Sequence, residues 1–260
     1  MKTLKDRYED VGSRWRQDFS SIRRPDLFGK FIDVIIDNAE FESAKVLGLM
    51  SGDAGLELFF ANHLVGLDKK VELDILDFSP AMIKVAKSEG IILRKIIGDV
   101  RSAKIESEYD FVILKFGLHD LPREDQPLVL QKISRLMSEN GRLILIVYFS
   151  PSREAQVHYN NMITLKDELV GYKSERHFAT LGEIVDMVIK AGLKPKIKML
   201  SESKINYFKT ELLDSGSRKA FSAKLFQMNI FAGIDDSLGI IHTADGPEIT
   251  FPLATLTARK

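Results

Sequence analysis

The hydrophobic pattern of the chain changes character near residue 45. Before that point, a charged and aromatic stretch leads into L-F-G-K-F-I-D-V-I-I-D, whose apolar positions recur at helical spacing, so we expect two helices within residues 1–44. Beyond it, short apolar runs alternate with helix-like segments. Five runs are K-V-L-G-L-M, V-E-L-D-I-L-D, I-I-L-R-K-I-I-G-D, Y-D-F-V-I-L-K-F and G-R-L-I-L-I-V-Y-F. Strands that alternate with helices predict a parallel sheet with crossover helices.

Several of the intervening segments carry helix signals. Ser79 precedes a first-turn proline and is a natural cap. The segment after the fourth strand has acids in its first turn and a terminal Asn140-Gly141, which predicts the end of a helix. Thr180 and Glu183 have the spacing of a capping box before an apolar helix that stops at Gly192. The helix after the first strand has an apolar stripe formed by Leu56, Phe59, Phe60 and Leu64.

The second half of the chain departs from simple alternation. Residues 151–178 form a polar stretch that contains His and Tyr. K-P-K-I-K-M-L and I-T-F-P-L-A-T-L-T-A-R then read as two more strands, but the segment between them, at about 203–248, is too long for a plain hairpin. We therefore predict an α/β fold with a doubly wound, seven-stranded, mostly parallel sheet and an insertion before its last strand.

Composition narrows the classes of function. The 260 residues are 45% hydrophobic and 28% charged, which suits one soluble globular domain or a domain with a small appendage. The absence of cysteine excludes disulfides, thiolate-metal sites and a cysteine nucleophile. A metal would need His, Asp or Glu, and we predict no metal site. The 37 basic and 37 acidic residues cancel, which disfavours a nucleic-acid partner. With no signal-peptide core and no membrane-length apolar run, we expect a cytoplasmic protein that does not enter a membrane.

Small and acidic residues follow the first three strands. In an open α/β sheet, ligands bind beyond the carboxyl ends of the strands. M-S-G-D-A-G follows the first strand and allows close backbone approach at a helix N-terminus, although many such turns are only connections. Asp77 could accept both hydroxyls of a ribose or cap the helix at Ser79-Pro80. Asp99 could accept a hydrogen bond from an adenine amino group or shape a turn.

The fourth strand brings His119 and Asp120 to the same edge of the predicted sheet. An imidazole has an unperturbed pKa of about 6.5 and can take a proton at neutral pH, so His119 is a candidate general base. The alternative is that its ring only packs beside a ligand. A small loop, two acids and a histidine at the ends of consecutive strands together favour a binding site over plain scaffold.

These motifs resemble those of class I S-adenosylmethionine-dependent methyltransferases. V-L-G-L-M-S-G-D-A-G is similar to the first motif of the family, commonly V-L-D-L-G-C-G-T-G, and L-D-I-L-D-F-S-P-A-M-I-K-V-A is similar to the strand that carries the ribose acid. K-F-G-L-H-D-L-P resembles a segment of small-molecule O-methyltransferases in which the histidine deprotonates the acceptor hydroxyl. The likeness covers about residues 40–200 and the last strand, and it implies a Rossmann-like methyltransferase fold.

The resemblance implies S-adenosyl-L-methionine as the cofactor and a small-molecule acceptor that is methylated on O, N or C. His119 would be the catalytic base. The cofactor would be bound by Met50, Ser51, Gly52, Asp53, Asp77, Phe78, Asp99, Val100 and Lys115. Substrate contacts are expected from Tyr8, Trp15, His158 and Tyr159, for which packing of an accessory helix is the alternative. Whether the chain forms a homodimer stays open.

The chain would then divide into functional segments. Residues 1–44 would form an N-terminal helical lid, residues 45–150 the cofactor-binding core, and residues 151–178 a lid or substrate segment. Residues 179–260 would complete the core, with the insertion at about 203–248.

The first motif departs from the family pattern at three positions. Gly48 stands where an acid is usual, Met50 where the first glycine is usual, and Ala54 replaces the third glycine. The missing acid is a common partner of the loop and of the methionine ammonium group, and Asp53 could supply a displaced carboxylate. Two alternatives therefore stay open: an S-adenosylmethionine-binding enzyme with other chemistry, and a non-catalytic binding protein on a degenerate scaffold. A nicotinamide dehydrogenase is disfavoured because the G-x-G-x-x-G spacing is absent.

Overall fold

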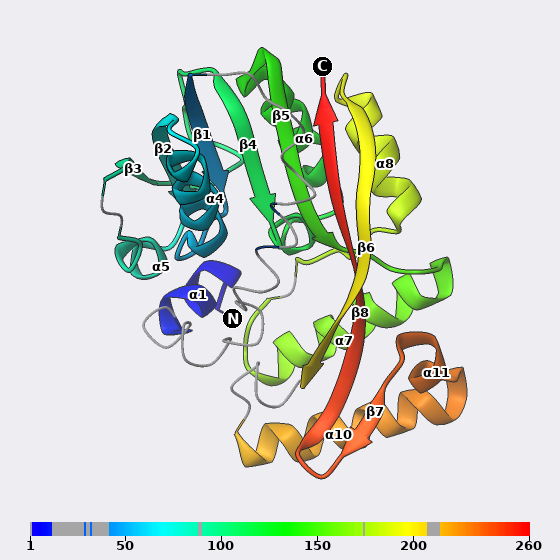
Figure 1. Cartoon of the computed structure of the whole chain (residues 1–260). Coiled ribbons are helices and arrows are strands. Elements are labelled where there is room, and N and C mark those ends of the chain that lie inside the picture. Colours follow the sequence, from blue (N-terminus) through cyan, green and yellow to red (C-terminus); the bar gives the residue numbers. More distant parts are fainter. Residues whose placement is uncertain are drawn as a thin grey trace.

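The computed structural model describes residues 2–11, 29, 32, 42–87, 90–173, 175–206 and 214–260. Its centre is one sheet with the strand order β3-β2-β1-β4-β5-β8-β6, and a short β7 pairs with β8 (Figure 1). The strands are β1 (Ser43–Leu49), β2 (Lys70–Asp77), β3 (Ile92–Ile97), β4 (Tyr109–Lys115), β5 (Met137–Tyr148), β6 (Lys194–Asn206), β7 (Ile241–Thr243) and β8 (Gly246–Arg259). All seven expected strands are present, and β7 is an eighth strand of three residues within the insertion.

The sheet is mostly parallel, as predicted. Strands β3, β2, β1, β4 and β5 pair in parallel, whereas β8 runs antiparallel to both β5 and β6. The strand order reverses between β1 and β4, because the chain first builds outward to β3 and then returns to the other side of β1. The carboxyl ends of β1 and β4 therefore flank the switch point where open α/β sheets bind ligands.

Helices cover both faces of the sheet and explain why its central strands are continuously apolar. One face packs Val46 and Ile113 against α4 (Gly55–Gly66) and α7 (Arg153–Leu169). The other face packs Leu47 and Val112 against α6 (Asp125–Leu136) and α8 (Leu181–Lys190). The expected apolar stripe of α4 is partly wrong, since Phe59 is 37% exposed while Leu56, Phe60 and Leu64 are buried.

Most of the predicted helix signals are confirmed. Ser79 caps α5 (Pro80–Lys84) by accepting a hydrogen bond from the Met82 N–H at 3.2 Å. Thr180 and Glu183 form both halves of the capping box of α8.

The expected helix end at Asn140-Gly141 is wrong. Helix α6 ends at Leu136, and β5 begins at the next residue with an extended backbone. A Cβ on Gly141 would lie 2.8 Å from the carbonyl oxygen of Tyr109 and 2.9 Å from that of Ser138. This glycine therefore permits a close backbone approach at the start of the β4–β5 pair, instead of stopping a helix.

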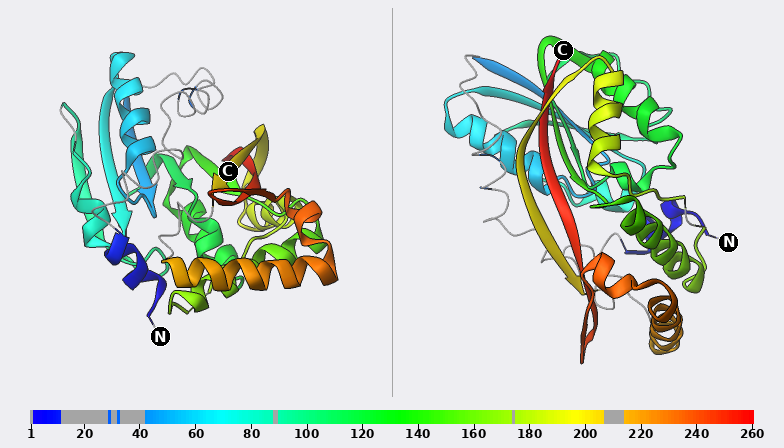
Figure 2. Two further views of the ribbon diagram at one scale, coloured as in Figure 1. Left: turned by 90° about the horizontal axis from the view of Figure 1, so that it is seen from below. Right: turned by 90° about the vertical axis from the view of Figure 1, so that its right-hand side faces the viewer.

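The insertion is a helical unit carried by two long strands. Strand β6 continues to Asn206 and β8 starts at Gly246, so both extend beyond the rest of the sheet. Between them lie α10 (Ser215–Ala232), α11 (Ile234–Leu238) and β7. Figure 2 shows α10 and α11 beside α7, below the carboxyl ends of the parallel strands in the view of Figure 1. The functional division of the chain into lid and core segments stays a prediction.

Two short helices lie at the carboxyl edge of the sheet. Helix α1 (Leu4–Val11) contacts α5, and the single turn η2 (Leu118–Asp120) follows β4 (Figure 1). The second helix expected within residues 1–44 falls almost entirely outside the described residues. No helix in the described part of the chain has the length and apolar character needed to cross a membrane.

Candidate functional site

The loop after β1 is a tight turn with a glycine-like backbone path. The Ser51 N–H donates to the carbonyl oxygen of Leu76 at 3.1 Å, and the Ala54 N–H donates to that of Ser51 at 2.8 Å. Met50, Gly52 and Ala54 all have positive φ angles, of 51°, 56° and 57°. A left-handed conformation is ordinary for glycine and costs other residues roughly 1–2 kcal/mol. Met50 and Ala54 thus stand at positions where the family pattern has glycine and where the backbone conformation still favours glycine.

Met50 is accommodated by a glycine at the end of the neighbouring strand. A Cβ on Gly117 would lie 2.8 Å from Sδ of Met50 and 2.9 Å from its Cβ. The turns after β1 and β4 are therefore packed directly against each other. This contact joins the loop to the segment that carries His119.

Asp77 fixes the loop to the end of β2. Its Oδ2 accepts the Gly52 N–H at 2.7 Å, and its Oδ1 accepts the Ser79 N–H at 2.9 Å. The residue is 5% exposed, and burial raises the pKa of its carboxyl to about 6. The helix-cap alternative is wrong, since Ser79 is the cap of α5. Each carboxylate oxygen has two lone pairs, so Asp77 keeps acceptor capacity for the hydroxyls of a ligand.

The adenine-side candidates lie at the end of β3 and beyond β2. Both carboxylate oxygens of Asp99 accept hydrogen bonds from the Arg101 guanidinium, at 2.9 Å from Nε and 2.6 Å from Nη2. These bonds hold the pKa of Asp99 below its usual value. Val100 is buried, and Phe78 meets the ring of Tyr8 edge-on at 5.7 Å between centroids. Asp99 therefore faces a cation within the protein, and its adenine role stays a prediction.

A second buried carboxyl lies beneath the loop and was missed by the sequence analysis. Glu57 of α4 is 0% exposed, and neither of its carboxyl oxygens has a hydrogen-bond partner. Burial raises the pKa of Glu57, while the Lys115 ammonium group at the end of β4 opposes that shift. The available signal was helical spacing, because Glu57 lies three, four and seven residues before the buried Phe60, Ala61 and Leu64.

Glu57, and not Asp53, fills the space beside Gly48. A Cβ added to Gly48 would lie 2.6 Å from Cγ of Glu57 and 2.5 Å from Oγ of Ser51. Asp53 instead uses Oδ1 to accept the Gly55 N–H at 3.3 Å, within the loop itself.

His119 is buried in an aromatic environment at the end of β4. Its ring lies 4.6 Å from that of Phe178 and 5.5 Å from that of Tyr148, measured between centroids. The Nε2 atom is 3.7 Å from Oδ1 of Asp120, and Nδ1 has no hydrogen-bond partner. Burial lowers the pKa of His119 to about 4, so the imidazole is neutral at pH 7. A neutral imidazole is the form that can accept a proton.

Charged side chains form a buried network next to His119. The Tyr8 hydroxyl donates to Asp120 Oδ2 at 2.6 Å, which ties α1 to the turn after β4. Arg176 lies between Asp120, at 3.3 Å, and Asp167, at 3.6 Å. Lys166 pairs with Asp167 at 3.1 Å. The members of this network other than Tyr8 and Asp120 were not predicted from the sequence, although Lys166 follows Tyr159, Met162 and Ile163 at the spacing of a buried helix face.

The other predicted substrate residues lie elsewhere. His158 Nδ1 is 2.6 Å from the Ser237 hydroxyl of α11, and the Tyr159 hydroxyl donates to the Thr250 carbonyl oxygen at 2.7 Å. These contacts fit the packing alternative for both residues. Trp15 lies outside the described residues. Tyr8 is hydrogen-bonded to Asp120, the neighbour of His119 in the chain, and Tyr159 stacks on Phe178, whose ring packs against that of His119.

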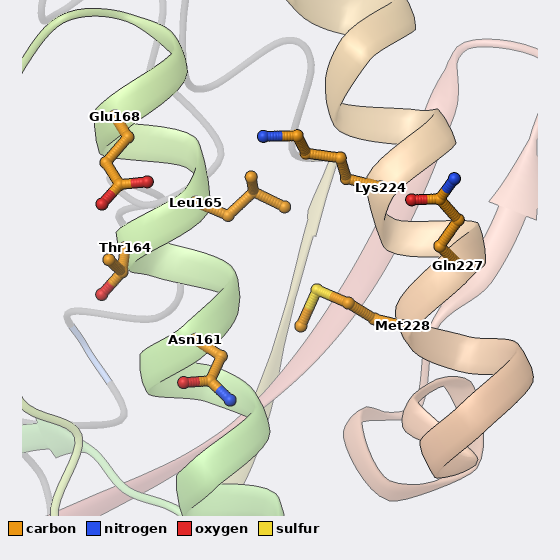
Figure 3. Close-up of a pocket in the computed structure, with 7 residues that line it drawn as sticks. All are labelled: Asn161, Thr164, Leu165, Glu168, Lys224, Gln227 and Met228. Carbon is orange, nitrogen blue, oxygen red and sulfur yellow. The ribbon is translucent and has the colours of Figure 1, made fainter.

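A shallow groove between α7 and α10 contains none of the predicted site residues (Figure 3). Its volume is ≈ 390 Å³, and Leu165 of α7 faces Lys224 and Met228 of α10 across it. The predicted site instead lies at the carboxyl ends of β1, β2 and β4.

Comparisons with known proteins agree with this fold. Residues 46–141 match the model of a family described as a methyltransferase domain. No curated protein matches the chain. The YcgJ protein from Bacillus subtilis superposes with a TM-score of 0.70 at 17% identity, over 89% of this chain and 99% of that one. Magnesium protoporphyrin IX methyltransferase from Synechocystis, solved with bound S-adenosylhomocysteine, superposes with a TM-score of 0.59 at 13% identity, over 99% of this chain and 98% of that one.

At these identities the solved structures establish the fold, and the family match covers residues 46–141. The matched range begins in β1 and includes the loop, Asp77, Asp99 and His119. Residues 46–141 therefore form a region similar to a methyltransferase domain, and the chain shares the fold of a solved methyltransferase.

Proposed function

We propose that the chain methylates a small-molecule acceptor on O, N or C, and that His119 is the general base where the acceptor must lose a proton. One observation carries the proposal: the loop fixed by the Asp77–Gly52 hydrogen bond packs directly against the turn that leads to a buried, neutral His119. The proposed cofactor loop and the proposed base therefore follow two neighbouring strands, β1 and β4.

The residues at this edge fit S-adenosylmethionine. The buried Ser51 hydroxyl and both oxygens of Glu57 have no hydrogen-bond partner, so polar groups are available beneath the loop. Met50, Ser51, Gly52 and Asp53 would surround the methionine part. Asp77 would accept the ribose hydroxyls, and the adenine side would be held by Phe78, Asp99 and Val100. Lys115 would lie beneath the loop and balance its acids.

S-adenosylmethionine supplies a methyl group on a positively charged sulfur that is already activated for transfer. The contribution of the chain is to align the acceptor and to receive its proton. His119 Nδ1 would accept the proton, and Asp120, 3.7 Å from Nε2, would stabilise the imidazolium that forms. The low pKa of His119 keeps the ring unprotonated before the reaction.

The helix that covers the carboxyl edge of the sheet favours a small acceptor molecule. Helix α1 lies over the site, because Tyr8 is hydrogen-bonded to Asp120 and contacts Phe78. A folded polymer would have to displace this helix, whereas a small molecule could enter beneath it. The balanced charge of the chain also disfavours a nucleic-acid substrate.

Calorimetry with S-adenosylmethionine and S-adenosylhomocysteine tests the cofactor, and a labelled-methyl assay against cell extract tests transfer. We expect Asp77→Ala to abolish binding, because the variant loses the ribose acceptor and the anchor of the loop. We expect His119→Ala to bind normally but to lose turnover by ~10²-fold or more. Unchanged turnover in His119→Ala would remove the base assignment. Binding without methyl transfer would favour an S-adenosylmethionine-binding enzyme with other chemistry, and absence of binding would favour the non-catalytic alternative.

A further inference from the structure

We propose that Glu57 binds the α-ammonium group of the cofactor and so replaces the acidic residue that is absent from position 48. The inference rests on the proposed function, since it assigns a role towards S-adenosylmethionine. It adds a residue outside the loop itself, from the first turns of α4.

The first observation is an unsatisfied buried carboxyl. Glu57 is fully buried, yet neither carboxyl oxygen has a hydrogen-bond partner, and the neighbouring Ser51 hydroxyl is also without one. A buried acid of this kind destabilises the folded chain unless something else binds it. Groups left unsatisfied at a strand-end loop are explained most simply by a polar ligand that satisfies them.

The second observation is steric. A Cβ on Gly48 would lie 2.6 Å from Cγ and 3.3 Å from Cδ of Glu57. A side chain at position 48 and the side chain of Glu57 would therefore occupy the same volume. Gly48 and Glu57 therefore form a matched pair. Because Gly48 has no side chain, the carboxyl group of Glu57 on α4 can occupy the space that an acidic side chain at position 48 of β1 would fill.

The third observation is the sign of the local charge. The charged groups that act on Glu57 include Lys115, Asp53 and Asp77. Among the described residues, three carboxyl groups and one ammonium group thus lie in or around the loop, which favours a ligand that brings a positive charge. The α-ammonium of the methionine part meets this requirement and also provides N–H donors for the unsatisfied oxygens of Glu57.

Calorimetry on Glu57→Gln tests the inference with two ligands. S-adenosylhomocysteine carries the α-ammonium group, whereas 5′-methylthioadenosine lacks the whole amino-acid part. We expect the variant to bind the first ligand ~10-fold or more weakly, since a charge-assisted hydrogen bond is lost, and to bind the second as the wild type does. Asp77→Asn is the matched control, because it should weaken both ligands through the ribose.

Two further measurements separate ligand binding from a structural role. The melting temperature of ligand-free Glu57→Gln should equal or exceed that of the wild type, because the variant removes a buried carboxyl that lacks a partner. Gly48→Asp alone should destabilise the fold by steric overlap, whereas Gly48→Asp/Glu57→Ala should recover most of the affinity for S-adenosylhomocysteine.

The outcomes distinguish the two proposals. If the wild type and Glu57→Gln bind S-adenosylhomocysteine equally well, the role of Glu57 is overturned and the proposed function still stands. Equal weakening of both ligands in Glu57→Gln would also overturn it. Wild type that binds neither ligand would overturn the proposed function and this inference together.

Discussion

Two buried acids beneath one loop differ in what satisfies them. Asp77 accepts two backbone N–H groups, whereas Glu57 accepts no hydrogen bond from another residue. Burial raises the pKa of both carboxyls. Asp77 thus shapes the loop before any ligand binds, and Glu57 is left available for one. This difference is why substitutions at the two positions should affect ligand fragments differently.

The pKa of Asp77 predicts how cofactor affinity depends on pH. The folded value of about 6 exceeds the ordinary value of 3.8, so the contribution of this group to stability is fully present below pH 3.8 and is lost as pH rises through about 6. Ribose hydroxyls donate best to the carboxylate form. Affinity for S-adenosylhomocysteine should therefore rise between about pH 5 and pH 7, as calorimetry at intervals of pH can measure.

Asp77→Asn provides the control for this pH dependence. Its amide does not titrate, so the rise in affinity across the same interval should disappear. A rise of equal size in the variant would assign the pH dependence to another group.

At the scale of elements, one glutamate connects two helices. Glu183 of α8 accepts the Thr180 N–H at 2.8 Å, Gln156 Nε2 of α7 at 2.6 Å and Arg153 Nη1 at 2.5 Å. Burial alone would raise the pKa of Glu183, but these hydrogen bonds outweigh it and lower the value to about 2. The capping box therefore also fixes α8 to α7, which carries Lys166 and Asp167 of the network beside His119.

Thr180→Ala should reduce the free energy of unfolding by about 1 kcal/mol, because the Glu183 N–H loses the Thr180 hydroxyl as its acceptor. Urea unfolding followed by circular dichroism measures the change. Thr164→Ala on the exposed face of α7 is a matched control and should change stability by less than about 0.5 kcal/mol. Equal losses in both variants would show that the cap contributes nothing specific.

At the scale of the whole molecule, the insertion shares the core of the sheet. Phe221 and Leu225 of α10 are buried in the same cluster as Tyr159 of α7 and Phe251 of β8. That cluster continues to Val46 and Leu73 in the central strands. We therefore expect the insertion and the sheet to unfold in a single transition.

Phe221→Ala should lower the free energy of unfolding by roughly 3–5 kcal/mol, because it opens a cavity at a fully buried ring. Phe226→Ala on the same helix removes a ring that is 61% exposed and should have a much smaller effect. Denaturant unfolding monitored at two wavelengths measures both the stability and the number of transitions. A separate early transition in Phe221→Ala would show that the insertion folds independently.

The sequence by itself determined the features that depend on neighbours along the chain. Apolar periodicity predicted every strand of the main sheet, and the caps at Ser79 and Thr180 need only the next few residues. The loop after β1 and Asp77 were predicted for the same reason, since each directly follows a strand.

Only the tertiary structure decided which distant groups meet. Glu57 lies against Gly48 because α4 folds back over β1. Arg176 contacts Asp120 although 56 positions separate the two residues in the sequence (176 − 120 = 56). Gly141 permits backbone approach to Tyr109 instead of ending a helix, which no local signal distinguishes. Burial likewise set the pKa values of Asp77 and His119. Local propensities fix where strands and turns lie, but the solvation and partners of a side chain depend on contacts that form only when the chain is folded.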